Sequence, residues 1–60
     1  MKYGIKIDKS VRGYPKTKHG VIWVDETEEN YTTRKKAKTW KTKKEATKAI
    51  YESWEMIEVL

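Results

Sequence analysis

The sequence has no cysteine and no phenylalanine, only one proline and one histidine, and no long hydrophobic run. Without cysteine the chain can form neither a disulfide nor a thiolate metal site. Small secreted domains commonly need disulfides, so their absence favours a reducing compartment. The N-terminus has no apolar signal-peptide region. The longest apolar run, residues 21–24, is far shorter than the roughly 20 residues that span a bilayer. We therefore expect a cytoplasmic protein that does not bind membranes.

The length and the aromatic content predict one domain, residues 1–60, with a thin core. A chain of this size buries only about 60% of the surface that its unfolded form exposes. Aliphatic residues are few, whereas the chain has three tryptophans and four tyrosines. We therefore expect the tryptophans to pack in the core, and Tyr14 and Tyr51 to be the exposed aromatic side chains.

The net charge of +5 is unevenly distributed along the chain. Residues 34–48 contain eight basic residues and a single acid, Glu45, whereas the other 45 residues contain six basic and eight acidic residues. Such an asymmetry carries information about binding partners and not about the fold.

Hydrophobic periodicity predicts strands at both ends of the chain and in its centre. Residues 3–7 alternate between apolar and polar positions, as do residues 55–60, and residues 21–24 form a β-branched and aromatic run. A third strand is expected within residues 31–40, and the Arg-Lys-Lys triplet in this range leaves its ends open. Residues 9–20 have the composition of an exposed loop.

One helix is predicted after Trp40. Thr42 and Glu45 have the spacing of a capping box, and small or apolar residues follow at helical spacing from Ala46 as far as Ser53. The fold class is therefore α+β: a small antiparallel sheet of three to four strands packed against one helix, in the order β-β-β-α-β. The exposed edges of so small a sheet leave a monomer or a weak dimer open.

The sequence shows no catalytic constellation. The single histidine, His19, lies in a loop without a positioned partner, and no set of metal-ligand residues has zinc-site spacing. The acidic residues within 25–29 are expected to form a solubilising turn, and the glycines form no phosphate-binding motif. We therefore expect a protein that is not an enzyme and that has no cofactor and no metal.

The basic segment is the strongest candidate for a binding site. Three of its lysines surround the predicted helix start, where cations oppose the macrodipole but where free backbone N–H groups attract anions. The alternatives are a solvated face that only keeps the protein soluble and a surface for an acidic protein. The candidate nucleic-acid-binding residues are Arg34, Lys35, Lys36, Lys38, Lys41, Lys43, Lys44 and Lys48.

Residues 38–46, Lys-Thr-Trp-Lys-Thr-Lys-Lys-Glu-Ala, resemble the start of the helix in the arm-type DNA-binding domain of phage and transposon tyrosine integrases. The resemblance implies a three-stranded sheet in the major groove, bases contacted near Trp23, Lys36 and Lys38, and phosphates held by lysines at the helix start. The acidic turn and the additional C-terminal strand depart from that family. In overall style the chain also resembles small stand-alone phage and prophage proteins, some of which bind a host protein.

Together these observations predict non-enzymatic nucleic-acid binding through a basic strand–helix surface, with double-stranded DNA as the expected ligand. The alternative is a small phage-type protein-interaction module that binds or inhibits a host protein. Such a module would bind an acidic surface of its partner through the basic segment, or it would pair a strand of its partner with an open edge of its own sheet.

Overall fold

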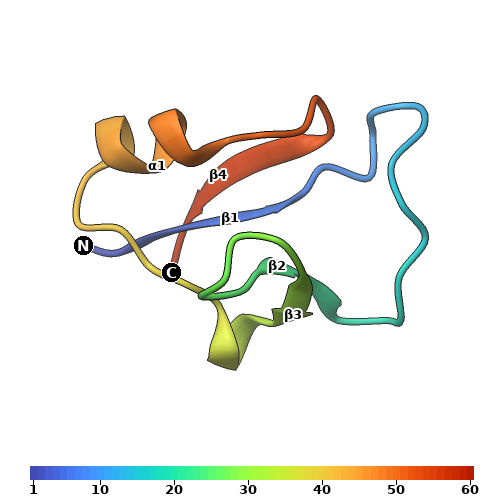
Figure 1. Cartoon of the computed structure of the whole chain (residues 1–60), viewed down its shortest axis with the longest axis horizontal. Helices are drawn as coiled ribbons and strands as arrows, with labels where there is room; N and C mark the ends of the chain where they lie inside the picture. Colours follow the sequence, from blue (N-terminus) through green and yellow to red (C-terminus); the bar gives the residue numbers. More distant parts are fainter.

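The computed structural model describes all 60 residues, and its four strands form one antiparallel sheet (Figure 1). The sheet order is β3-β2-β1-β4, so the strand nearest the N-terminus lies inside the sheet. The elements are β1 (Tyr3–Ile7), β2 (Val21–Val24), β3 (Tyr31–Thr33), the 3₁₀ turn η1 (Arg34–Lys36), α1 (Lys43–Ala49) and β4 (Glu55–Val59). The predicted α+β class and the order β-β-β-α-β are confirmed.

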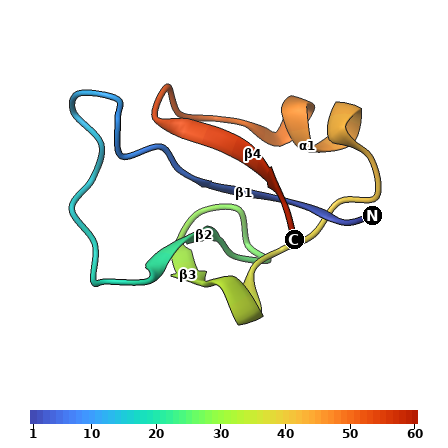
Figure 2. The same ribbon diagram turned by 180° about the vertical axis from the view of Figure 1, so that it is seen from behind.

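The longest strand pair joins the two ends of the chain. β1 and β4 pair antiparallel over five residues, with Ile5 opposite Ile57 and Tyr3 opposite Val59. The ladder continues past the strands, since the Leu60 amide donates to the Lys2 carbonyl at 2.8 Å. The two chain ends therefore lie beside each other, as Figure 2 also shows from behind.

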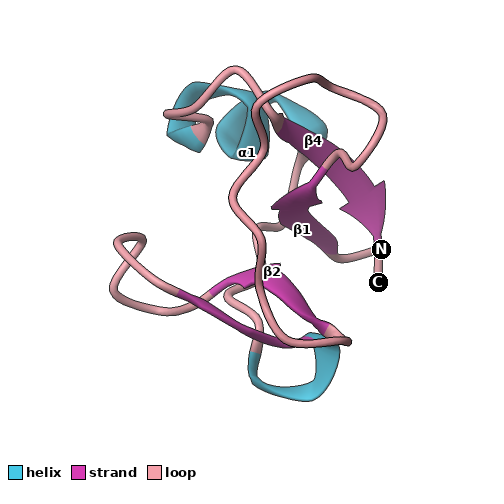
Figure 3. Cartoon of the chain, turned by 90° about the vertical axis from the view of Figure 1, so that its right-hand side faces the viewer, coloured by secondary structure: helices cyan, strands magenta, loops and turns pink.

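The main core lies between the sheet and α1, which packs on β1 and β4 (Figure 3). Ile5 and Ile7 of β1 are essentially inaccessible to solvent, and so is Ala46 of the helix. Because successive strand residues point to opposite faces, Ile5 and Ile7 share the face that also carries Ile57. A small residue at position 46 lets this short helix approach the sheet closely.

The opposite face of the sheet carries a second, smaller cluster around Trp23. Trp23 lies beside Lys6 in the β1–β2 pairing and is only 6% exposed. Gly4 lies against its indole and close to the Leu60 side chain, while the Lys6 ammonium lies 5.9 Å from the ring centroid. Trp23 is therefore a core residue, as the composition predicts. The integrase resemblance implies an exposed, base-contacting side chain near Trp23, and for Trp23 itself this expectation is wrong. Trp40 and Trp54 are half-buried.

The third strand is shorter than residues 31–40, because it ends at Thr33. The next three residues, Arg34–Lys36, form the exposed turn η1, which keeps three consecutive cationic side chains in solvent instead of placing one of them inward. The chain returns to the sheet at Trp40, which exchanges two backbone hydrogen bonds of 2.8 and 2.9 Å with Tyr3.

The helix begins as the capping residues predict but ends early. The Thr42 hydroxyl accepts a 3.1 Å hydrogen bond from the Glu45 amide, which satisfies one of the free donors of the first turn. The helix stops at Ala49, and Ile50 is already extended. The expected continuation to Ser53 is wrong, because the Glu55 carboxylate accepts hydrogen bonds from the amides of Tyr51 and Glu52 and holds the chain in a turn before β4.

No helix in the structure combines the length and the apolar character that crossing a membrane requires.

Candidate functional site

The structure divides the basic segment into two groups that lie at opposite ends of the molecule. η1 packs beside β2, whereas α1 packs on β1 and β4. Figures 1 and 3 accordingly place η1 and α1 far apart, and Figure 1 shows residues 37–42 joining them along the left border of the fold. The η1 group consists of Arg34, Lys35 and Lys36, and the helix group consists of Lys41, Lys43, Lys44 and Lys48.

The side chains of both groups are exposed, and none of them forms an ion pair. Arg34 is the only one that contacts an aromatic ring, with its guanidinium 6.0 Å from the centroid of Trp23. These seven cations therefore remain available to an anionic partner.

Lys38 differs from the other predicted site residues, because the fold already uses its charge. Its ammonium group lies 2.8 Å from a carboxylate oxygen of Glu28 and 5.3 Å from the ring centroid of Trp40. The pair links the acidic turn to the segment before the helix. Lys38 would have to leave two intramolecular partners to contact a ligand.

The helix start offers fewer anion-binding groups than the sequence predicts. α1 has only seven residues, so its macrodipole is small. Thr42 already accepts from one first-turn amide, and Glu45 adds a carboxylate to the same turn. Any attraction for anions at this end comes mainly from the exposed lysines and not from the helix terminus.

The acidic turn between β2 and β3 is a defined structure. The Asp25 carboxylate accepts from the hydroxyl of Thr27 at 2.6 Å and from its amide at 3.0 Å. These two hydrogen bonds hold the pKa of Asp25 below its ordinary value, and the bond from the Thr27 hydroxyl has the larger effect. Glu28 has a φ of 62°, a left-handed conformation that few non-glycine residues adopt. Hydrogen bonds within the turn therefore hold the backbone at Glu28 and Glu29.

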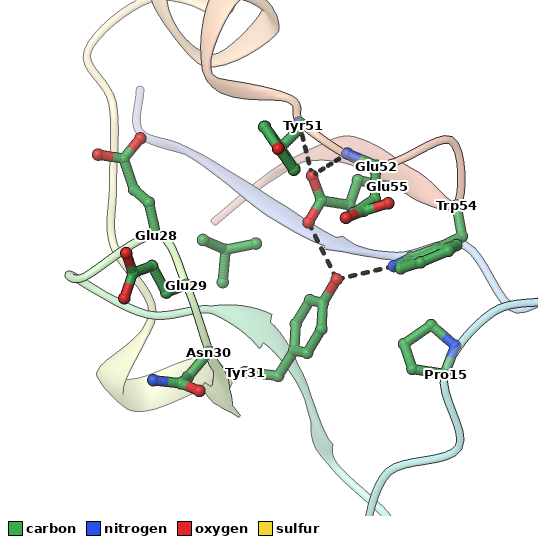
Figure 4. A pocket seen from close by; sticks show the side chains of 10 residues that line it. Pro15, Glu28, Glu29, Asn30, Tyr31, Tyr51, Glu52, Trp54 and Glu55 are labelled. Carbon is green, nitrogen blue, oxygen red and sulfur yellow. Dashed lines mark hydrogen bonds between the residues drawn. The ribbon is translucent and has the colours of Figure 1, made fainter.

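These two glutamates form one side of a pocket of about 530 Å³ (Figure 4). The opposite side comes from the segment between α1 and β4, and Tyr31 of β3 and Pro15 of the long loop complete it. Acidic and aromatic side chains dominate the lining. The acidic–aromatic pocket is lined by Pro15, Val24, Glu28, Glu29, Asn30, Tyr31, Tyr51, Glu52, Trp54 and Glu55.

A hydrogen-bond chain fixes one wall of the acidic–aromatic pocket. The Trp54 indole donates to the Tyr31 hydroxyl at 2.7 Å, and that hydroxyl donates to the Glu55 carboxylate at 3.0 Å. Figure 4 shows this chain continuing to the backbone of Tyr51 and Glu52. Burial is the main effect on the pKa of the Tyr31 phenol and raises it above its ordinary value. The hydrogen bond from Trp54 lowers this pKa by a smaller amount, and the hydrogen bond to Glu55 and the charge of Glu55 raise it further. The side chains of Tyr31, Trp54 and Glu55 in this wall therefore hold one another in place.

Sequence patterns do not predict this pocket. Its residues come from three separate segments with no common spacing, and the acids of residues 25–29 have the composition of a solubilising turn. The available signal is the repeated proximity of glutamate to an aromatic residue, as in Glu29 and Tyr31 or Glu52 and Trp54. Of the two tyrosines predicted to be exposed, Tyr51 is 87% exposed, whereas Tyr14 is half-buried.

No three His, Cys, Asp or Glu side chains lie close enough together to hold a metal ion. The carboxylates of the acidic–aromatic pocket thus surround a space and do not converge on a point. His19 is an exposed residue of the long loop.

Comparison with known proteins finds no protein-family model, no curated protein and no solved structure that matches this chain. The resemblance to integrase arm-type domains therefore stays a prediction.

Proposed function

We propose that this chain is a non-enzymatic nucleic-acid-binding domain whose ligand is double-stranded DNA. The observation that supports the proposal best is the set of seven exposed cations in the η1 and helix groups, none of which is paired with a carboxylate. Lysine and arginine side chains in this state can neutralise phosphates and release the counterions that surround them.

The dimensions of the molecule suit a contact with both sides of a DNA groove. The fold measures 28 × 21 × 18 Å, and the major groove of B-form DNA is about 12 Å wide. The backbone between η1 and α1 follows one border of the molecule, on the left in Figure 1. The two basic groups would then contact phosphates on opposite sides of a groove, and the segment between them would face its opening.

Charge reversal of each basic group tests the proposal. One variant carries Lys41→Glu, Lys43→Glu and Lys44→Glu, and a second carries Arg34→Glu, Lys35→Glu and Lys36→Glu. A control with the same change in net charge carries Lys9→Glu, Arg12→Glu and Lys18→Glu, at exposed positions of the long loop. The readout is the affinity for a labelled duplex at several salt concentrations, with a single-stranded probe alongside.

Both test variants should bind less tightly than the control. The slope of log affinity against log salt should fall by about 0.9 for each phosphate that a variant no longer neutralises. Parent-like binding by both test variants would refute the assignment. An equal decrease in the loop control would show that only net charge matters.

The free edge of β4 supports a protein-interaction module as the second candidate. β4 pairs with β1 on one side only, so its other backbone edge is open, and Val59 on this strand is 48% exposed. Open edges accept a further strand from a partner. A pull-down from bacterial lysate separates the two candidates, because a protein partner is retained after nuclease treatment and a DNA-mediated one is released.

A further inference from the structure

The acidic–aromatic pocket has the size of a small-ligand site, and it does not overlap the two basic groups. Its volume of about 530 Å³ falls in the usual range for such sites, about 300–1,000 Å³. The side chain of Val24, itself only 4% exposed, belongs to its lining. Three aromatic residues line the pocket, and one of them, Tyr51, is 87% exposed.

The charge of the pocket is negative in a protein that carries a net positive charge. Four of its ten lining residues are glutamates, and no basic residue lines it. Glu28 is paired with Lys38, and Glu55 is held by the wall hydrogen bonds. The carboxylates of Glu29 and Glu52, in contrast, form neither an ion pair nor a hydrogen bond, so they are available to a ligand.

Two of the three aromatic side chains of the pocket, Tyr31 and Trp54, are held in place by hydrogen bonds. Because the indole of Trp54 is bonded to the hydroxyl of Tyr31, and this hydroxyl to Glu55, binding would not have to immobilise these side chains. Preorganisation of this kind lowers the entropic cost of binding.

The arrangement favours a flat organic cation over a metal ion. The carboxylates stand apart around the pocket instead of gathering at one point, so a compact divalent ion could reach few of them. A guanidinium group is planar, stacks on aromatic rings and carries five N–H donors that can reach separate carboxylates. An ammonium group is smaller and more strongly hydrated.

We propose that the acidic–aromatic pocket binds a guanidinium group, with Glu29 and Glu52 as its anionic partners and Tyr51 and Trp54 as its aromatic contacts. The guanidinium belongs either to an arginine of a partner protein or to a small arginine-like molecule. This inference is independent of the proposed DNA contact, since none of the seven basic residues lines the pocket.

Three peptides test the ligand chemistry on the intact chain. Acetyl-Gly-Arg-Gly-amide is the test ligand, the citrulline peptide is its neutral isostere, and the lysine peptide supplies a charge of different shape. Binding is followed by the Trp54 indole N–H signal in two-dimensional ¹H–¹⁵N NMR spectra, which the Trp54→Phe variant assigns. The arginine peptide should shift this signal in a saturable way, and the other two should bind at least about tenfold more weakly.

Substitutions at the carboxylates test the location. Glu29→Gln combined with Glu52→Gln should weaken binding of the arginine peptide at least about tenfold. The control pair, Glu26→Gln with Glu45→Gln, makes the same charge change at exposed positions outside the pocket and should retain parental affinity within about twofold. None of these side chains is buried, and circular dichroism checks that each variant is folded.

Agmatine identifies the source of the guanidinium. Agmatine that binds as tightly as the peptide supports a small molecule, whereas a tighter peptide supports an arginine of a protein partner. Equal binding of the citrulline or the lysine peptide would overturn the proposal. So would an unchanged affinity in the Glu29 and Glu52 double variant, whatever the outcome of the DNA titrations.

Discussion

Gly4 lies directly against the indole of Trp23, so closely that a methyl group at Gly4 would come within 2.9 Å of the Trp23 Cζ3 atom and equally near to Leu60 Cδ1. Both Gly4 and Trp23 are buried, and neither the β1 backbone nor the ring can move freely. We expect Gly4→Ala to lower the free energy of unfolding by roughly 1–3 kcal/mol, as overpacking of a core does. Urea denaturation monitored by tryptophan fluorescence measures the decrease. The exposed control Thr39→Ala should change stability by less than about 0.5 kcal/mol, and parental stability of Gly4→Ala would contradict the close approach.

The hydroxyl of Thr42 should contribute measurably to stability, because it satisfies the Glu45 amide at the start of α1. Thr42→Ala leaves that donor without its intramolecular acceptor, and we expect a decrease in stability of about 1 kcal/mol. Thr42→Ser keeps an oxygen in the same place and should retain most of the stability. Thermal unfolding of the three proteins measures the difference. The cap would be unimportant if the alanine and serine variants melted together.

The raised pKa of Tyr31 predicts a loss of stability at alkaline pH. The ordinary value is 10.0, and burial is the main cause of the increase. As the pH rises, Tyr31 therefore loses its proton at a lower pH in the unfolded chain than in the folded protein. The contribution to stability is complete below pH 10 and is lost as the pH rises through the folded pKa.

Comparison with Tyr31→Phe isolates this effect from the titration of lysines. The variant lacks the hydrogen bonds of the phenol and should be about 1 kcal/mol less stable than the parent at pH 8. This difference should shrink above pH 10, since only the parent has the Tyr31 proton to lose. Urea denaturation at several pH values measures it, and a constant difference from pH 8 to 11 would count against the raised pKa.

Thr27 should control the acid titration of Asp25. The Thr27 hydroxyl is the main cause of the lowered pKa of Asp25, and Thr27→Val removes this donor but keeps the backbone amide. The pKa of Asp25 should therefore rise toward its ordinary value of 3.8. Because the pKa of Asp25 is lowered in the folded state, its ionised carboxylate stabilises the fold at pH values above the ordinary pKa. This contribution to stability is lost as the pH falls through the pKa of the folded state.

The side-chain carboxyl ¹³C shifts, titrated from pH 6 to 2, follow Asp25 directly. Asp8 serves as an internal control, because its pKa is also lowered but by hydrogen bonds from Ser10. Its titration should be the same in the parent and in Thr27→Val. A shift of Asp8 in the variant would indicate a general change in the fold.

Local patterns in the sequence are sufficient for the elements whose structure depends on neighbouring residues. The alternation of Tyr3, Ile5 and Ile7 predicts β1 because the two isoleucines are buried on the same face of that strand. Thr42 predicts the start of α1 because a side-chain cap is a contact within a few residues. The end of α1 is not predictable in this way, since it depends on the carboxylate of Glu55, which holds the chain after Ile50.

The candidate sites depend on contacts between distant segments, and so the sequence predicts them only in part. The basic segment is continuous in sequence, but η1 and α1 separate its two groups in space. Lys38 is equivalent to its neighbours in the sequence, whereas in the fold it binds Glu28, ten residues earlier. The acidic–aromatic pocket joins residues up to 40 positions apart, a relationship that no local pattern contains.

The pairing of β1 with β4 sets the order of events when the chain is made. β1 is an internal strand, and one of its two neighbours is formed by residues 55–59. During synthesis the partner strand β2 is available first, whereas the ladder on the other side of β1 cannot form until residues 55–59 have left the ribosome. Because so many stabilising contacts join residues far apart in sequence, we expect the sheet to close late and comparatively slowly for so small a protein.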